Sequence, residues 1–161
     1  MILRKFSSTL APWLTRFPWL IAIPYRIWSF FQAKHTLGAV GVIFNPDGQV
    51  LLVKHVFHPK FPWGLPGGWV GRKENPADTV CREIKEEIGL TVTIHNIILV
   101  DVPRARHLDL AYLCNSNGNL DIQELSYELL DYDWFDVDQL PLLLRFHYQV
   151  IQKAVLMRSD I

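Results

Sequence analysis

Hydrophobic runs separated by short polar turns dominate the chain from Leu37 onward. The segment GAVGVIF (residues 38–44) is followed by NPDG (45–48) and then by QVLLVKHVF (49–57). Proline at the second turn position and glycine at the fourth suit a type I turn, so this stretch predicts a β-hairpin. Further strands are predicted where β-branched and aliphatic residues gather again, at TVTIHNIILVDV (91–102), HLDLAYLC (107–114) and LLDYDWFDV (129–137).

Two segments carry helical spacing instead. In the first, Asn75 can cap free amide groups, Pro76 tolerates the first helical position, and Gly89 ends the helix. Between these caps, apolar residues recur at spacings of three and four and form one face: Ala77, Val80, Cys81, Ile84 and Ile88. The second helix is predicted from Val137 to about Met157, with Pro141 near its start. Strands interleaved with helices in so short a chain predict an α/β sandwich.

The N-terminal residues 1–36 differ in composition from the rest. They contain three tryptophans and three evenly spaced prolines, together with Arg16 and Arg26. The uncharged run from Phe17 to Tyr25 is far shorter than the roughly 20 apolar residues of a membrane span. Arg16 also interrupts the order of a signal peptide. We expect a helical extension that packs on its own domain or on a dimer partner; an aromatic-rich segment lying on a membrane surface is the open alternative.

Composition adds a few constraints. With 161 residues, half of them hydrophobic, the chain can bury one good core, which we assign to a main domain over residues 37–161. Sixteen basic and sixteen acidic residues give a formal charge of zero, so no nucleic acid partner is expected. Cys81 and Cys114 lack the spacing of a zinc site or a disulfide framework. We therefore expect reduced thiols and a cytoplasmic protein.

The first predicted helix is unusually acidic. Glu83, Glu86 and Glu87 are three and four positions apart, so their carboxylates project from one edge of the helix. Like charges at that spacing destabilise an isolated helix by about a few tenths of a kcal/mol per pair. One explanation is a solvated face paired with Arg82 and Lys85. The other is a site for a hard cation, because Mg²⁺ prefers oxygen ligands and binds carboxylates together with substrate phosphates.

The spacing around this helix decides between the two explanations. From Gly68 to Leu90 the chain reads GWVGRKENPADTVCREIKEEIGL, which matches G-x5-E-x7-R-E-U-x-E-E-x-G-U, with U aliphatic, at all nine specified positions. A chance match is expected on the order of 10⁻⁹ per window. The pattern resembles the Nudix box. The surrounding strands are compatible with that family over about residues 37–158, and residues 1–36 lie outside the resemblance.

The resemblance implies a Nudix hydrolase with a mixed sheet between helices, an α/β/α sandwich. Such enzymes cleave a nucleoside diphosphate linked to another moiety by attack of water on phosphorus, with Mg²⁺ or in some cases Mn²⁺. In this sequence Glu83, Glu86 and Glu87 match the metal-binding glutamates. Arg82 matches an arginine that orients them, and Glu74 matches a supporting position.

The resemblance also assigns Gly67 and Gly68 to the loop whose backbone approaches the metal. The chemistry agrees with this arrangement. A pyrophosphate carries negative charge that a cation must neutralise, and the attacking water needs a lowered pKa. The repulsion along the acidic helix edge would then be relieved by a bound divalent cation.

The general base is open at this stage. Members of the family use either a glutamate of the box or an acidic residue from a later loop or strand edge. The later candidates here are Glu124, Glu128 and Asp131, just before the aromatic pair Trp134 and Phe135. We favour Glu128. A position in a surface loop explains Glu124 and Asp131 equally well.

Two groups of basic side chains are candidates for substrate binding. The first accompanies the aromatic residues Phe57, Phe61 and Trp63 and consists of His55, His58 and Lys60. These aromatic rings could stack on a base or belong to the core. The second group consists of Arg104, Arg106 and His107. Pro103 follows the box by 13 residues, earlier than the proline of many ADP-ribose-cleaving relatives, which weakens that substrate assignment.

We therefore predict a metal-dependent pyrophosphohydrolase acting on a nucleotide derivative, with a homodimer as a possible assembly. Two functions of other classes stay open. A Nudix fold without activity could sense nucleotides as a binding module, although such modules often lose glutamates of the box and none is missing here. The aromatic N-terminal segment could instead make this a protein that docks on a membrane surface or on a partner.

Overall fold

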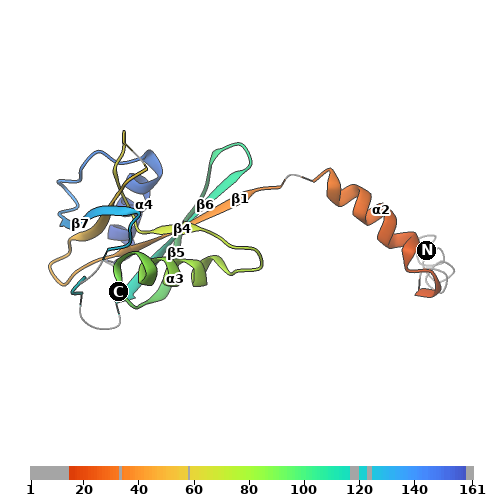
Figure 1. Cartoon of the computed structure of the whole chain (residues 1–161), viewed down its shortest axis with the longest axis horizontal. Helices are drawn as coiled ribbons and strands as arrows, with labels where there is room; N and C mark the ends of the chain where they lie inside the picture. Colours follow the sequence, from red (N-terminus) through yellow and green to blue (C-terminus); the bar gives the residue numbers. More distant parts are fainter. Residues whose placement is uncertain (1–14, 33, 58, 117–119, 123–124, 159–161) are drawn as a thin grey trace. The chain divides into compact units, whose positions relative to one another are not determined.

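The computed structural model describes residues 15–32, 34–57, 59–116, 120–122 and 125–158. The chain divides into two compact units between Lys34 and His35. Among the described residues, the first unit contains helix α2 (Trp19–Phe30) and the second contains the sheets and the other helices (Figure 1). No described helix is long and apolar enough to cross a membrane.

The second unit alternates strands and helices. Its described elements are, in order, β1 (Thr36–Ile43), β2 (Val50–His55), β3 (Trp63–Gly64), β4 (Gly67–Trp69), α3 (Pro76–Ile88), β5 (Val92–Arg104), β6 (His107–Ser116), β7 (Leu129–Phe135) and α4 (Arg145–Arg158). One sheet has the strand order β4-β1-β6-β5, with β1 parallel to β6 and the other pairs antiparallel. The other sheet, β3-β2-β7, is antiparallel throughout. The predicted mixed sheet is confirmed.

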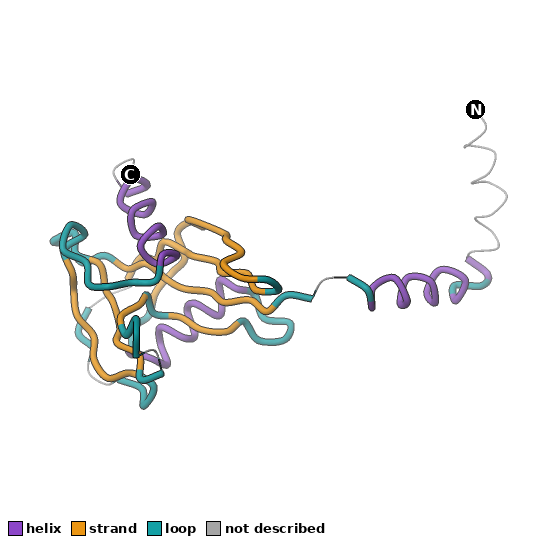
Figure 2. Tube along the Cα trace, turned by 90° about the horizontal axis from the view of Figure 1, so that it is seen from above, coloured by secondary structure: helices purple, strands orange, loops and turns teal. Residues whose placement is uncertain are grey.

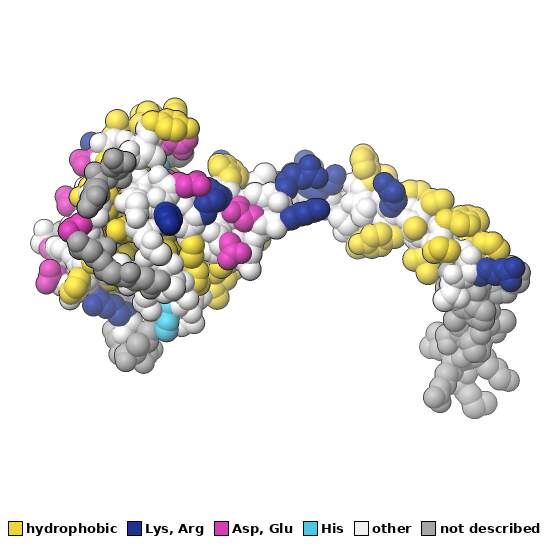
Figure 3. Space-filling view, turned by 60° about the horizontal axis from the view of Figure 1, so that its bottom comes forward, with side chains coloured by type: hydrophobic (Ala, Val, Ile, Leu, Met, Phe, Trp, Pro, Cys, Tyr) yellow, Lys and Arg dark blue, Asp and Glu magenta, His cyan; other side chains and the backbone are white. Residues whose placement is uncertain are grey.

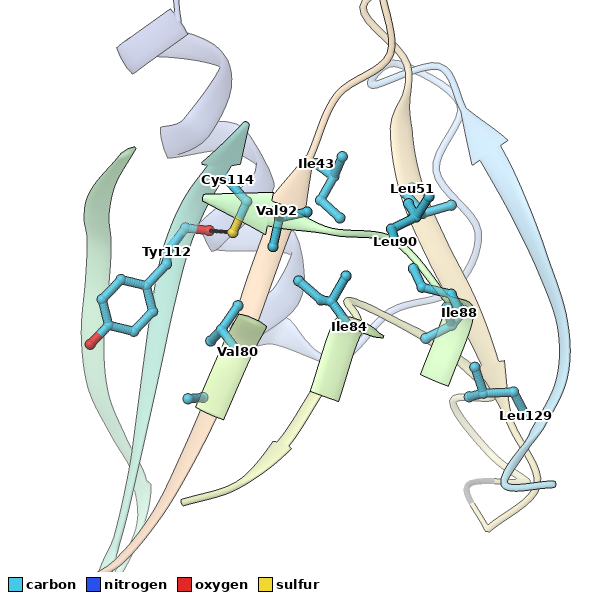
Figure 4. Packing of buried hydrophobic residues seen from close by; sticks show 12 residues of the cluster. Ile43, Leu51, Val80, Ile84, Ile88, Leu90, Val92, Tyr112, Cys114 and Leu129 are labelled. Atoms are coloured by element: carbon cyan, nitrogen blue, oxygen red, sulfur yellow. Dashed lines mark hydrogen bonds between the residues drawn. The ribbon is translucent and has the colours of Figure 1, made fainter. Parts of the chain in front are cut away.

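Helices α3 and α4 cover opposite faces of the strands, as the path of the chain in Figure 2 also indicates. Successive side chains of a strand point to opposite faces. In β1, Ala39 and Ile43 pack in one core with α3, whereas Val42 packs in a second core with α4. Figure 4 shows Val80 and Ile84 of α3 in the first of these cores. The α/β/α sandwich predicted from the sequence is therefore confirmed.

Helix α3 begins and ends where its sequence predicts. The side chain of Asn75 accepts a hydrogen bond from the Ala77 amide at 3.0 Å, and Pro76 is the first helical residue. Gly89 ends the helix with φ of +74°, a left-handed conformation that glycine adopts without strain. The buried residues Val80, Ile84 and Ile88 form its apolar face. The carboxylates of Glu83, Glu86 and Glu87 lie along one side of this face, and Glu87 is itself buried.

Two details of the predicted secondary structure are wrong. The Asn45–Gly48 turn forms, and Phe44 bridges Val50, but β1 and β2 then diverge into different sheets. Both edges of β1 are occupied by β4 and β6, so a full hairpin with β2 is impossible. Helix α4 begins at Arg145 rather than near Pro141. A proline disfavours helical conformation in the residue before it, which rules out a continuous helix from Val137 through Leu140 into Pro141.

The N-terminal unit contains the predicted aromatic-rich helix. Helix α2 continues through Pro24 and buries none of its residues. It carries one charged side chain, Arg26, within its twelve residues. Figure 3 shows hydrophobic side chains gathered over this segment. A short helix that leaves this much apolar surface uncovered needs a partner for that surface.

Candidate active site

Strand β4 brings two glycines against the acidic edge of α3. The backbone amide of Gly67 donates a hydrogen bond to Glu87 Oε2 at 3.0 Å. A Cβ at Gly67, whose φ is +145°, would collide with the backbone carbonyl oxygen of Ala39. A Cβ at Gly68 would lie 2.5 Å from the carboxyl carbon of Glu83. The absence of a side chain therefore allows β4 to lie close to β1 at Gly67 and close to α3 at Gly68.

Arg82 connects three carboxylates. Its Nε donates to Glu74 Oε1 at 2.8 Å, and its Nη2 donates to Glu74 Oε2 at 3.2 Å. Its Nη1 donates to both Glu83 Oε1 at 2.9 Å and Glu86 Oε2 at 3.0 Å. Because the planar guanidinium offers several donors in fixed directions, a single side chain can hold all three groups.

Glu74 is the best anchored of these carboxylates. It accepts a hydrogen bond from the Gly71 amide at 2.8 Å in addition to the bonds from Arg82. Hydrogen bonding from Arg82 and then from Gly71 lowers the pKa of Glu74 to about 2. The same contacts raise the pKa of Arg82 above its usual range. Glu74 therefore remains ionised and fixes the guanidinium from the side away from Glu83 and Glu86.

Glu87 differs from the other glutamates because it is buried, with 7% of its surface exposed. Burial, together with smaller contributions from the negative charges of Glu83 and Glu128, raises the pKa of Glu87 to about 8. The hydrogen bond from Gly67 opposes this shift. Near neutral pH, the cluster without metal therefore retains a proton on Glu87.

The donor set fits a hard divalent cation. Among the described residues no group of three or more His, Cys, Asp or Glu side chains is already arranged around a metal position. In this structure Arg82 donates a hydrogen bond to one oxygen of Glu83 and to one oxygen of Glu86. The Gly67 amide donates a hydrogen bond to one oxygen of Glu87. Each of these carboxylates has a second oxygen, and a cation would offset the burial and the smaller repulsion that keep Glu87 protonated.

Glu128 reaches this cluster from another part of the chain. The Ser126 amide donates to the Glu87 carbonyl at the end of α3 at 2.9 Å, and the Val56 amide donates to the Glu128 carbonyl at 3.0 Å. These bonds hold the segment before β7 beside the helix. The Glu128 side chain is exposed, yet its charge acts on the pKa of Glu87.

The other candidates for the general base are placed differently. Asp131 lies opposite Lys54 in the β2–β7 ladder, and its Oδ1 accepts a hydrogen bond from the Tyr132 amide at 2.9 Å. This is the geometry of an exposed strand residue. Glu124 lies outside the described residues, as does the substrate candidate His58.

A cavity of about 150 Å³ adjoins the glycines of β4. It is lined in part by Gly67 and Gly68. The side chains around it are mostly aromatic or polar, and include His55, Phe61, Trp63, Trp69, His107, Asp109 and His147. Four of the sequence candidates, His55, Phe61, Trp63 and His107, are therefore brought together beside the glycines that contact the acidic cluster. Three others, Lys60, Arg104 and Arg106, are exposed and do not line this cavity.

Sequence reasoning missed three of the cavity residues. His147 lies in α4, where its Nδ1 accepts the Leu65 amide at 2.8 Å, which leaves the proton of the neutral ring on Nε2. Asp109 accepts a hydrogen bond from His107 Nε2 at 2.9 Å. Trp69 stacks near His107 with ring centroids 4.9 Å apart. The alternation of His107 and Asp109 on one face of β6 was the available signal, because polar residues there face an otherwise buried side.

Replacing Arg82 with lysine is expected to reduce turnover by about 10- to 100-fold while the fold is kept. Lysine retains the charge but cannot bond Glu74, Glu83 and Glu86 from fixed directions. Steady-state kinetics and circular dichroism of the purified variant would test this. If Arg82→Lys kept the turnover of wild type, Arg82 would have no role in positioning the glutamates.

We expect different consequences when Gly67 and Gly68 are each replaced by alanine. Gly67→Ala should lower the free energy of unfolding by more than about 2 kcal/mol, because the added Cβ meets backbone at an unfavourable φ. Gly68→Ala should leave stability nearly unchanged but weaken Mg²⁺ affinity about tenfold, because the flexible Glu83 carboxylate would be displaced. Urea unfolding and calorimetric titration separate the two effects. Equal loss of stability in both variants would contradict the assignment of Gly68 to the metal site.

The α/β/α sandwich and the cluster of carboxylates at a glycine-containing strand define a class of protein, the hydrolases of phosphoric anhydrides. The sequence matches the NUDIX domain family over residues 34–154. The chain therefore belongs to the Nudix family and is a Nudix hydrolase.

Individual relatives agree with this family. An ADP-ribose pyrophosphatase of Methanocaldococcus jannaschii is 30% identical over 125 residues, which cover 73% of this chain and 72% of that protein. A MutT-like protein of Streptomyces ambofaciens is 27% identical over 107 residues, covering 66% and 67% of the two chains. The crystal structure of an ADP-ribose pyrophosphatase from Streptococcus suis has a TM-score of 0.62 at 28% identity and covers 79% of this chain and 92% of that one.

Proposed function

We propose that this Nudix hydrolase is a Mg²⁺-dependent pyrophosphohydrolase that cleaves a nucleoside diphosphate linked to another moiety. The observation that carries the proposal is the buried Glu87 carboxyl, which accepts a hydrogen bond from the Gly67 amide and lies within electrostatic reach of Glu83. A carboxylate cluster that needs an added positive charge, next to a cavity of the size of a small ring system, suits a polyphosphate and its cation. Mn²⁺ has the same preference for oxygen donors and could replace Mg²⁺.

Glu83, Glu86 and Glu87 would hold the cation, with the backbone of Gly67 beside them. When bound, the cation would neutralise phosphate charge and lower the pKa of the attacking water. Arg82 would keep Glu83 and Glu86 in place through the bonds described above. Glu74 supports Arg82 in turn, so that its contribution to catalysis would be indirect.

Glu128 is proposed as the general base. It is ionisable, exposed to solvent and close enough to Glu87 for its charge to act on that group. It would accept the proton of the water that attacks phosphorus. Its backbone bond to Val56 fixes the position of the residue without using the carboxylate.

The cavity beside Gly67 supports a substrate with a ring on one side of the diphosphate. Phe61, Trp63 and Trp69 offer apolar faces, and Asp109 offers an acceptor for the N–H or O–H groups of a base or sugar. ADP-ribose is the first compound to test, because two relatives are named for it. We also propose that the enzyme works in the cytoplasm, where the two free cysteines would remain reduced.

A substrate panel assayed with Mg²⁺ and with Mn²⁺ tests the proposal. The panel should contain ADP-ribose, NADH, dinucleoside polyphosphates, sugar nucleotides and nucleoside triphosphates, with release of phosphate-containing products measured by chromatography. We expect hydrolysis that stops with a chelator and is absent in Glu83→Gln. Binding of one of these nucleotides without hydrolysis under any condition would instead favour a nucleotide-sensing module.

A further inference from the structure

Helix α2 exposes an unusually wide apolar surface. Nine large hydrophobic side chains in and directly after it are exposed: Trp19, Leu20, Ile21, Ile23, Tyr25, Ile27, Trp28, Phe30 and Phe31. Figure 3 shows hydrophobic side chains along this segment. Monomeric soluble proteins rarely leave a continuous apolar patch of more than a few hundred Å² uncovered. This surface is therefore an interaction surface.

The distribution of these side chains around the helix indicates what covers them. At about 100° per residue, the nine positions span about 240° of the circumference. The remaining arc carries only Ala22, Arg26 and Ser29. A helix that lies on a protein needs an apolar stripe only a little wider than about 100°. Contact with a flat protein face would therefore leave much of α2 in water, whereas a helix embedded at the boundary of headgroups and acyl chains contacts lipid over a wider arc.

The length of α2 restricts how it can meet a bilayer. Its twelve residues make a helix about 18 Å long, against a hydrocarbon core about 30 Å thick. It can lie in the interface but cannot cross. Trp19, Tyr25 and Trp28 have the amphipathic rings that favour the headgroup level. Arg26, on the narrow polar arc, would then face headgroups or water.

Charge along the chain indicates which lipids are preferred. Residues 1–34 contain five basic residues, Arg4, Lys5, Arg16, Arg26 and Lys34, and no acidic residue. Residues 35–161 contain eleven basic and sixteen acidic residues, a formal charge of −5. The zero net charge of the chain is therefore the sum of a basic N-terminal part and an acidic remainder. An anionic surface would attract the N-terminal part and repel the catalytic unit.

We infer that residues 15–34 dock the enzyme on an anionic lipid bilayer, with α2 lying in the interface and the Nudix unit held outside it. Binding of such a segment at the interface is driven by the apolar area that it buries and by attraction of its basic residues to anionic lipids. Lys34, whose Nζ lies 5.6 Å from the Phe30 ring centroid, places a cation directly beside the apolar surface. The inference is independent of which substrate the active site takes.

Vesicle co-sedimentation of the full-length protein tests the inference. We expect binding to vesicles of phosphatidylcholine mixed with phosphatidylglycerol, and binding at least about tenfold weaker to phosphatidylcholine alone, since each basic residue near an anionic surface contributes to attraction. High salt should weaken the binding to the mixed vesicles. Failure to sediment with the mixed vesicles, or equal binding to both kinds, would overturn the inference.

Pairs of variants distinguish a specific membrane interface from nonspecific adsorption to vesicles. Ile23→Ser with Ile27→Ser should abolish sedimentation, whereas Leu142→Ser with Leu156→Ser, which alters exposed leucines of the catalytic unit, should not. Arg16→Glu with Arg26→Glu should weaken vesicle binding by about tenfold or more. Arg145→Glu with Lys153→Glu changes charge equally on exposed residues of α4 and should not weaken it.

The alternative explanation is that a second copy of the chain covers the apolar surface of α2. Analytical ultracentrifugation without lipid would detect it as a dimer that dissociates in Ile23→Ser with Ile27→Ser. That result, together with lipid binding unaffected by these substitutions, would overturn the inference in favour of a protein interface. Melting temperature and Mg²⁺ binding should be unchanged in every α2 variant, which shows that the catalytic unit remains folded.

Discussion

Replacing Glu87 with glutamine is expected to abolish turnover and, at the same time, to raise the melting temperature of the metal-free protein. Burial and the charges of Glu83 and Glu128 oppose ionisation of Glu87 in the folded state. Glutamine has nearly the same shape, carries no charge and can still accept the Gly67 amide through its carbonyl oxygen. The variant therefore keeps the packing and removes the electrostatic cost.

The pH dependence of stability distinguishes this explanation from simple repacking. The pKa of Glu87 is about 8 in the folded protein, whereas the ordinary value for a glutamate side chain is 4.5. Below pH 4.5 both folded and unfolded states are protonated, so the group imposes no cost. Between these values only the unfolded chain is ionised, and stability falls as pH rises, by about 1.4 kcal/mol per unit. Above pH 8 the full cost remains.

At pH 7 the gain for metal-free Glu87→Gln should therefore be a few kcal/mol, or an increase in melting temperature on the order of 5 °C or more. Differential scanning calorimetry with a chelator from pH 5 to about pH 9 would measure it. The difference between variant and wild type should grow with pH and then level off. A difference that does not change with pH would mean that Glu87 is not the ionising group.

Magnesium should reverse the order of stability. A ligand that binds only the folded state raises stability by mass action, so millimolar Mg²⁺ should raise the melting temperature of wild type but not of Glu87→Gln. Because the cation competes with the proton, its affinity for wild type should rise with pH up to about pH 8. Turnover of the variant should fall by a factor on the order of 10³ or more, since a bound metal supplies several kcal/mol of transition-state stabilisation.

A matched variant identifies the source of the stabilisation. Glu86→Gln also removes a proposed metal ligand, but Glu86 is exposed and bonds Arg82 rather than the buried Gly67 amide. It should therefore lose Mg²⁺-dependent stabilisation without becoming more stable in the metal-free state. If Mg²⁺ raised the melting temperatures of wild type and Glu87→Gln equally, the cation would not bind at Glu87.

Local signals explain why the helix of the site could be predicted from sequence. Asn75, Pro76 and Gly89 set the ends of α3 through interactions within a few residues, and the spacing of Glu83, Glu86 and Glu87 follows from the helical repeat alone. The resemblance to a known family placed Gly67 in the loop beside the metal, but the hydrogen bond from its amide to Glu87 was not predicted. Neither glycine carries a side chain from which such a contact could be inferred.

Features that depend on distant parts of the chain could not be predicted. The pairing of β1 with β6 and β4, rather than with β2, is decided by the packing of two cores on opposite faces. The cavity joins Trp69, Asp109 and His147 from three different elements, and no spacing in the sequence relates them. The segregation of charge between residues 1–34 and 35–161 was readable in the sequence, but the zero net charge hid it.

Replacing Glu128 with glutamine is expected to reduce kcat by about 10² to 10⁴ while Mg²⁺ affinity stays nearly unchanged. A general base that does not contact the metal contributes to the proton transfer and little to ion binding. The segment that carries Glu128 is held by backbone bonds from Ser126 to Glu87 and from Val56 to Glu128 itself. Because these bonds do not involve the carboxylate, the substitution should leave the fold and the position of the residue intact.

Comparison with Glu83→Gln decides which group is the base. If Glu128 is the base, Glu83→Gln should lose Mg²⁺ affinity and rate together, and Glu128→Gln should lose rate alone. The acidic limb of the kcat profile should also flatten in Glu128→Gln, because the carboxylate whose protonation stops catalysis is gone. Wild-type turnover in Glu128→Gln, combined with retained Mg²⁺ binding and lost activity in Glu83→Gln, would instead assign the base to Glu83. The segment around Glu128 would then serve only to close the end of α3.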